Sequence, residues 1–167
     1  MKDVAERFNR IGSTTSTTLS SLNTTIEKAV EYIRQRLPQL SSGEVKINLE
    51  IPQDFTAKAN QHLLGWVFEN LLRNGVEALH GEGGEIFVIG KVRGMRIIID
   101  VKDHGVGILR RHWRDIFRPG YSIKKRGWGL GLSLAKRIVE DVHKGRIFVY
   151  ESKIDKGTTI RVQLISR

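Results

Sequence analysis

Three short segments of the sequence carry residue types that could together bind a nucleotide. The first is FENLLRNGVEAL, in which Asn70 and Asn74 lie four residues apart and therefore on one face of a helix, with Glu77 continuing that face. Amide oxygens are hard, neutral ligands that suit a Mg²⁺ ion already holding water and phosphate oxygens. A solvated polar stripe on an amphipathic helix would give the same pattern.

The second segment is DHGVGI, from Asp103 to Ile108, which follows a β-rich run. A carboxylate at a strand end, followed by two glycines, can present a hydrogen-bond acceptor in a tight pocket. Adenine has an exocyclic amino donor where guanine has a carbonyl acceptor, so a fixed carboxylate would select adenine. An ordinary Asp-x-Gly turn is the alternative explanation.

The third segment is GWGLGLSLAKRIV, from Gly127 to Val139. A helix N-terminus exposes free N–H groups and a partial positive charge, and glycines ahead of it allow a phosphate chain to approach. A glycine-rich turn packed against a neighbour would have the same composition. The preceding segment is a basic loop rather than a strand and no GK[ST] follows, so the pattern is neither a Rossmann motif nor a P-loop.

The composition sets limits on the class of protein. The chain has 167 residues, enough for one domain with a hydrophobic core, and it has no cysteine, which excludes disulfides and thiolate metal sites. It has no apolar run near the roughly 20 residues of a membrane span, and its first residues lack the apolar core of a signal peptide. We therefore expect a cytosolic domain that belongs to a longer chain.

The net charge of +10 is unevenly distributed. Residues 1–85 contain 9 Lys and Arg against 11 Asp and Glu, whereas residues 86–167 contain 19 against 7. The basic half suggests a polyanionic partner such as nucleic acid, a membrane surface or nucleotide phosphates. A well-solvated surface would also account for it.

Periodicity and breakers predict an α+β layered sandwich, because strands alternate with grouped helices. The predicted helices are residues 22–37 (closed by Pro38), 57–79, a short one within 108–117, and 130–143. The predicted strands are residues 45–51, 86–92, 96–101, 146–150 and 158–164. The Ser/Thr-rich stretch 13–25 is interpreted as a linker, and residues 118–127 as a flexible basic loop.

Together these motifs resemble the catalytic, ATP-binding domain of bacterial sensor histidine kinases, within the ATPase superfamily shared with gyrase, MutL and a heat-shock chaperone. The likeness extends over residues 45–165 in order and spacing. The matching motifs are the N box (70–78), the DxGxGI box (103–108), the F box (116–120), the GxGLGL box (127–132) and the late GT element (157–159).

The resemblance implies a Bergerat-type fold, in which a mixed, mostly antiparallel sheet is covered on one face by helices. It also implies a mobile ATP lid over residues 109–128, with Phe117 as its apolar anchor. Residues 1–25 would then be the tail of a dimerisation and acceptor helix plus a linker. Residues 26–167 would be the ATP-binding catalytic domain.

The resemblance also implies residue roles. Asp103 would bond the adenine amino group, with Thr158 helping through water, and Asn74 would ligate Mg²⁺ with Asn70 close by. His104 and Glu77 depart from the family pattern and receive no role. The other residues expected around ATP are Gly105, Gly107, Ile108, Lys124, Lys125, Arg126, Gly127, Gly129, Leu130, Gly131 and Leu132.

None of the five histidines lies in the H-E-x-x-N/T-P context of a phosphoacceptor. We therefore expect transfer of the γ-phosphoryl group of ATP to a histidine on a separate domain, and no autophosphorylation by this chain alone. The expected partners are that acceptor domain and a response regulator, not nucleic acid. The expected location is cytoplasmic, with a soluble, monomeric domain, and membrane anchoring of the full-length kinase is left open.

Other functions remain open at this point. An ATP hydrolase of the same superfamily has a general-base Glu four residues before the Mg²⁺-ligating Asn. This chain has Asn70 at that position, and the adjacent Glu69 points about 100° away around the helix. A protein-serine kinase of the anti-sigma type and a degenerate nucleotide sensor are further alternatives. A nucleic-acid-binding module is disfavoured because the basic residues are not interleaved with stacking aromatics.

Overall fold

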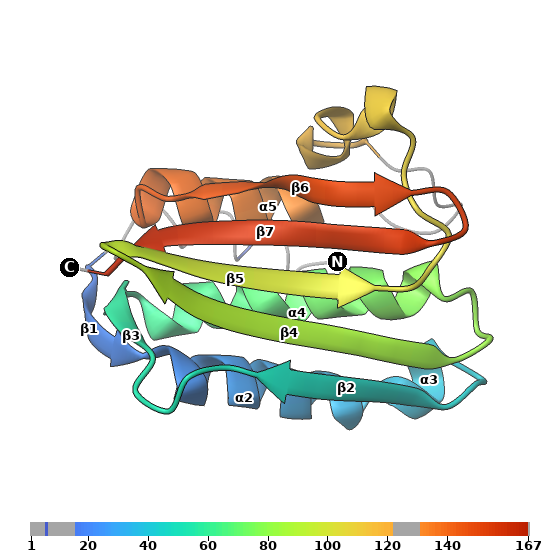
Figure 1. Cartoon of the computed structure of the whole chain (residues 1–167), viewed down its shortest axis with the longest axis horizontal. Coiled ribbons are helices and arrows are strands. Elements are labelled where there is room, and N and C mark those ends of the chain that lie inside the picture. The colour runs from blue at the N-terminus through green and yellow to red at the C-terminus, as the bar shows by residue number, and fades with distance from the viewer. Residues whose placement is uncertain (1–5, 7–15, 122–130, 167) are drawn as a thin grey trace.

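A five-stranded sheet forms one layer of the molecule, and helices form a second layer on one of its faces (Figure 1). The computed structural model describes Glu6, residues 16–121 and residues 131–166. The strand order is β2-β4-β5-β7-β6, with β2 parallel to β4 and every other pair antiparallel. The strands are β2 (Val45–Glu50), β4 (Gly84–Arg93), β5 (Arg96–Asp103), β6 (Arg146–Lys153) and β7 (Gly157–Ile165). The predicted mixed, mostly antiparallel sheet is confirmed.

The helical layer consists of α2, α4 and α5, which lie behind the sheet in Figure 1. The side chains of Leu64, Phe68 and Leu72 on α4 are fully buried, as are Ile86 and Ile99 on the covered face of the sheet. Burying each such side chain contributes about 1.5–3 kcal/mol, so α4 is the centre of the core. The helices are α2 (Leu22–Arg34), α3 (Leu37–Leu40), α4 (Gln61–Ala78) and α5 (Gly131–Arg137), which continues as a π-helical segment (Ile138–Val142).

Helix α4 begins at Gln61, so the predicted start at residue 57 is wrong. Thr56–Ala59 instead form strand β3, which pairs antiparallel with β1 (Thr18–Ser21). Asn60 has an extended backbone, and its side chain accepts a hydrogen bond from the Leu63 N–H, which makes it the N-cap. Alanines at 57 and 59 are compatible with helix or strand, and tertiary pairing decides between them.

The predicted linker 13–25 is also corrected. Residues 18–21 form β1, and Ser21 caps α2 by accepting a hydrogen bond from the Thr24 N–H at 3.3 Å. Leu22 and Thr25 are buried, so residues 18–25 are part of the folded domain and the predicted boundary at 25/26 lies inside α2. The same helix ends at Arg34 rather than at residue 37, because Pro38 occupies the first turn of the separate helix α3.

The remaining predicted elements are found close to their expected places. The β4–β5 hairpin turns at Gly94, and β6 and β7 form a second hairpin. The short helix expected within 108–117 consists of two 3₁₀ turns, η1 (Arg110–His112) and η2 (Asp115–Phe117). Most of the predicted loop 118–127 lies outside the described residues. Among the described helices, none has the length and apolar character needed to cross a membrane.

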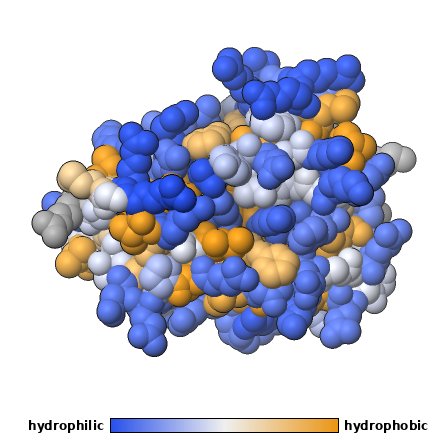
Figure 2. Space-filling view, in the orientation of Figure 1, coloured by the Kyte–Doolittle hydropathy of each residue, from blue (hydrophilic) through white to orange (hydrophobic). Residues whose placement is uncertain are grey.

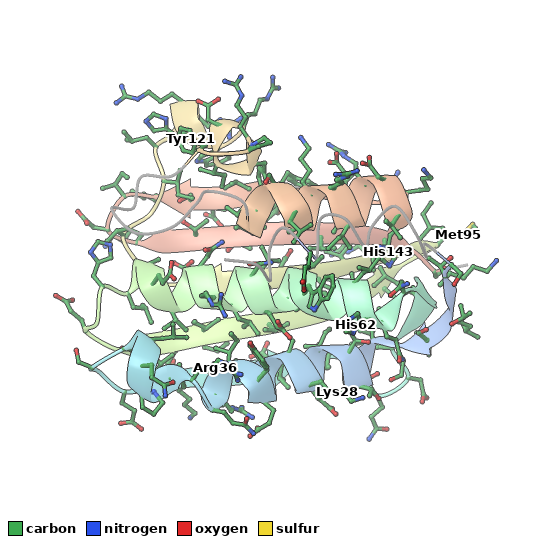
Figure 3. All side chains as sticks on the ribbon, turned by 180° about the vertical axis from the view of Figure 1, so that it is seen from behind. Lys28, Arg36, His62, Met95, Tyr121 and His143 are labelled. Carbon is green, nitrogen blue, oxygen red and sulfur yellow. The ribbon has the colours of Figure 1, made fainter. Side chains whose placement is uncertain are left out.

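A buried histidine connects the end of α5 to the start of α4. His143 is only 8% exposed, and its Nε2 accepts a hydrogen bond from the Asn60 N–H at 3.0 Å. Its Nδ1 lies 2.9 Å from the Ile138 carbonyl oxygen, so the neutral ring carries its proton there. Figure 3 shows His143 at the same end of the helical layer as His62, which lies in the first turn of α4. Burial lowers the pKa of His143 below 6.5, and the Ile138 hydrogen bond partly opposes this shift.

We expect His143 to make folding stability sensitive to acid. The folded-state pKa lies below the unfolded value of 6.5, so the stability supplied by the neutral ring is complete above 6.5 and is lost as pH falls through 6.5 towards the folded pKa. Urea unfolding should show a decline approaching 1.4 kcal/mol per pH unit in that window. The substitution His143→Gln should flatten the decline, whereas exposed His62→Gln should not. An equal slope in all three proteins would refute the role of His143.

Candidate nucleotide-binding site

Asp103 is the most constrained polar residue of the predicted site. It ends β5 opposite Thr158 of β7 and is 9% exposed. Its Oδ1 accepts hydrogen bonds from the Gly105 N–H at 2.9 Å and from the Thr158 N–H at 3.3 Å. No donor among the described residues reaches Oδ2. One oxygen therefore fixes the side chain and the other is available to a ligand.

Burial dominates the ionisation of this carboxyl group. It raises the pKa of Asp103 above 3.8, while the amide donors of Gly105 and Thr158 and the neighbouring His104 lower it. A carboxylate in this environment is costly to the fold unless it is hydrogen-bonded, which explains the two backbone donors. The ionised Asp103 carboxylate would therefore be a charged acceptor for a hydrogen-bond donor on a ligand.

Two glycines allow the loop after Asp103 to fit between α4 and the β6–β7 turn. A Cβ on Gly105 would lie 2.5 Å from the Ala78 carbonyl oxygen. Gly107 has φ +76°, and a Cβ there would collide with the Lys153 carbonyl oxygen. The loop is held by hydrogen bonds from the Val106 N–H to the Ala78 oxygen and from the Asp155 N–H to the Val106 oxygen. Glycine at both positions is therefore a requirement of close backbone packing.

Helix α4 carries the Asn70 and Asn74 motif and packs beside the first residue of α5, where the glycine-rich motif enters that helix. Asn70 donates from Nδ2 to the Trp66 carbonyl oxygen at 3.0 Å, and a Cβ on Gly131 would lie 2.8 Å from its Oδ1. One and a half turns further on, Gly75 faces Asp103, whose Cβ would be 3.6 Å from a Cβ added at Gly75. Helix α4 therefore lies against Asp103 at Gly75 and against the first residue of α5 at Asn70, which together with Asn74 forms the amide face of the helix.

The structure can be compared with the predicted site residue by residue. Asp103, Gly105, Gly107, Ile108 and Thr158 form one cluster. Asn70 contacts the position of Gly131, and Asn74 follows Asn70 one turn later on α4. Leu132 is partly buried against the core, and Phe117 is buried in it. Lys124, Lys125, Arg126, Gly127, Gly129 and Leu130 lie outside the described residues.

One residue of the cluster, Ser152, was not predicted from the sequence. Its Oγ accepts a hydrogen bond from the Ile108 N–H at 2.8 Å and lies 2.7 Å from Thr158 Oγ1. Neither the residue type nor its position in the strand sequence marks it, because its partners come from a loop 44 residues earlier and from the neighbouring strand.

A separate groove of about 700 Å³ lies between η1–η2, α5 and β6 and contains none of the predicted ATP-site residues. Trp113, Phe117 and Phe148 form part of its lining, and most of its charged residues are basic. Figure 2 shows hydrophilic side chains over the projecting η1–η2 region, where residues 110–118 contain four arginines and one aspartate. We assign the candidate site to Asp103 and α4, because the described residues predicted to bind ATP lie there and none of them lines the groove.

Comparison with known proteins decides the family. Residues 59–166 match the family described as "Histidine kinase-, DNA gyrase B-, and HSP90-like ATPase". The chain belongs to this family. The match covers α4, all three nucleotide motifs and strands β4 to β7, and it confirms the resemblance predicted from the sequence.

Curated relatives include sporulation kinases of Bacillus subtilis (strain 168). Sporulation kinase E is 35% identical over 130 residues, which are 75% of this chain and 17% of that protein. Sporulation kinase C is 30% identical over 140 residues, 80% of this chain and 32% of that protein. The chain therefore spans a third or less of the length of these relatives.

Solved structures confirm the predicted fold. The nucleotide-free catalytic domain of histidine kinase ThkA is 25% identical, with a TM-score of 0.77 over 90% of this chain and 95% of that domain. The mycobacterial sensor histidine kinase MprB is 19% identical, with a TM-score of 0.78 over 90% of this chain and 98% of that one, and shows the fold alone. The chain therefore has the fold of histidine kinase catalytic domains, within the ATPase family that it belongs to.

A pair of glycine substitutions tests the close packing of the Asp103 loop. Gly107 and Gly120 have nearly the same φ, +76° and +77°, but a Cβ at Gly120 meets nothing within 4 Å. Gly120→Ala should lower the free energy of unfolding by about 1 kcal/mol, because alanine must adopt a left-handed backbone conformation there. Gly107→Ala should cost about 1–3 kcal/mol more, because the Lys153 carbonyl must move.

Denaturant unfolding of both variants measures this difference directly. Equal destabilisation would show that the loop relaxes freely and that close approach to β6 is not a constraint.

Proposed function

We propose that this chain binds Mg-ATP and transfers the γ-phosphoryl group to a histidine on a separate phosphoacceptor domain, as part of a two-component kinase. The observation that carries the proposal is the geometry of Asp103, whose Oδ1 accepts from two backbone N–H groups while no donor among the described residues reaches Oδ2. An ionised Oδ2 is a charged acceptor for the exocyclic amino group of adenine. It would repel the carbonyl oxygen that guanine has at that position.

The amide face of α4 supports the placement of the rest of the nucleotide. Along the axis of α4, Gly75 beside Asp103 and Asn70 beside Gly131 are about 7.5 Å apart. Adenine at Asp103 would thus direct its phosphates towards Asn70, Asn74 and the first residue of α5. The predicted phosphate contacts from residues 124–130 remain part of this proposal.

The donor set fits a Mg²⁺ ion that arrives with the nucleotide. Among the described residues no group of three His, Cys, Asp or Glu could hold a metal by itself. Asn74 offers an amide oxygen, which suits Mg²⁺ that keeps phosphate and water ligands. When bound, the ion would neutralise phosphate charge, while the amide face of α4 orients the nucleotide.

Phosphoryl transfer to another domain fits the side chains better than hydrolysis. Asn70 stands four residues before Asn74, where a hydrolase would need a general base, and an amide cannot accept a proton from water. All five histidines lie in the described part of the chain, none has a phosphoacceptor motif, and His143 is buried with both nitrogens engaged. Catalysis by this domain would rest on positioning and charge neutralisation.

The wider context is part of the same proposal. One structural neighbour is titled as histidine kinase ThkA in complex with the response regulator TrrA, with 19% identity and a TM-score of 0.79. We infer that the full-length protein containing this chain also binds a response regulator, and that it passes its phosphoryl group to that regulator in the cytoplasm. The predicted tail of the acceptor helix, within residues 1–25, falls on the stretch before β1, most of which lies outside the described residues.

Calorimetric titration with ATP and GTP, with and without Mg²⁺, tests the binding proposal. We expect Mg²⁺-aided binding of ATP and at least about tenfold weaker binding of GTP. Asp103→Asn should weaken ATP binding by about 10- to 100-fold, the value of a charge-assisted hydrogen bond. The control Asp155→Asn removes an exposed carboxylate from the nearby β6–β7 turn, at a positive φ that Asn tolerates, and should bind as wild type.

Transfer is tested by adding a separately produced acceptor hairpin from a related kinase and following γ-labelled phosphate. Label on the hairpin histidine, dependent on Asn74, supports the proposal. Steady release of phosphate without the hairpin would make the chain a hydrolase instead, and loss of nucleotide binding in the wild type would remove the proposal altogether.

A further inference from the structure

Ser152 occupies a junction between three parts of the candidate adenine pocket. Its Oγ lies 2.8 Å from the Ile108 nitrogen, 3.2 Å from the Gly157 carbonyl oxygen and 2.7 Å from Thr158 Oγ1. Ile108 ends the loop that begins at Asp103, and Gly157 and Thr158 begin β7. A single hydroxyl group thus ties the Asp103 loop to the strand that also holds the Asp103 carboxylate.

The hydrogen-bonding capacity of this hydroxyl fixes the direction of each bond. A serine hydroxyl has one proton to donate and two lone pairs that accept. The Ile108 N–H can only donate, and the Gly157 carbonyl can only accept. All three contacts are satisfied together only if Ser152 donates to Gly157 and accepts from both Ile108 and Thr158. The proton of the Thr158 hydroxyl is then committed to Ser152.

The consequence is a site that presents acceptors only. Thr158 is 6% exposed and opposes Asp103 in the register of β5 and β7, and its N–H is bonded to Asp103 Oδ1. With its proton held by Ser152, Thr158 Oγ1 has only lone pairs to offer a ligand, and Thr158 lies directly opposite Asp103 in the sheet. Two neighbouring acceptors match an amino group, or a water bridging to one, and mismatch a carbonyl oxygen at that position.

We propose that Ser152 is a positioning residue that makes the pocket specific for a 6-amino purine by holding the Thr158 proton away from the base. The inference rests on the proposed function, since it concerns how the same pocket reads ATP. Ser152 itself need not touch the nucleotide. Without its hydroxyl, Thr158 could rotate and donate to a 6-oxo purine.

The matched ligands for a test are ATP and inosine triphosphate, which differ at the purine 6-position and share the ribose and phosphates. We expect Ser152→Ala to reduce the preference for ATP over inosine triphosphate by about three- to tenfold, the range of one hydrogen bond. Ser152→Thr, which keeps the hydroxyl, should restore the preference. Urea unfolding of each variant reports whether the fold is intact at the temperature of the titration.

A double-mutant cycle separates this role from simple structural support. Thr158→Val removes the hydroxyl that Ser152 is proposed to orient, so adding Ser152→Ala to it should leave the ATP preference unchanged. A further loss in the double variant would overturn the inference, as would an unchanged preference in Ser152→Ala alone. A wild-type protein that binds neither nucleotide would instead defeat the proposed function, so the two failures are distinct.

Discussion

The buried carboxylate of Asp103 is the constraint on which the rest of the site depends. Its Oδ1 needs two backbone donors, and they come from opposite sides, from the loop through Gly105 and from β7 through Thr158. Those donors meet only if β5 and β7 pair in the observed register, because a shift by one residue would turn Asp103 to the other face of the sheet. Gly157 is needed at the same point, since a Cβ there would collide with the Asp103 carbonyl oxygen.

Helix α4 connects the surroundings of Asp103 to the other end of the site, at the beginning of α5. Gly75 lies beside Asp103, and Asn70 lies beside Gly131 at the beginning of α5. The opposite ends of the two helices are joined by the hydrogen bond between the Asn60 N–H and His143. The α5 segment therefore lies against α4 at both of its own ends, which helps to preorganise the site.

The features that depend on local spacing were predictable from the sequence, and those that depend on distant pairing were not. Helical periodicity placed Asn70 and Asn74 on one face, and the DHGVGI pattern placed an acid at a strand end. The strand β3 was missed because Ala57 and Ala59 suit either structure until β1, some 40 residues earlier, pairs with them. Ser152 was missed because its partners lie in another loop and another strand.

The measurement that most directly tests whether Asp103 binds the nucleotide is an NMR titration of its side-chain carboxyl carbon, which gives the pKa of the group. In the ligand-free protein the pKa should lie above 3.8, because burial outweighs the two amide donors. With Mg-ATP bound it should fall, because a ligand that prefers the ionised carboxylate must by linkage stabilise that form. A pKa that ATP leaves unchanged while ATP binds would show that the nucleotide is recognised elsewhere.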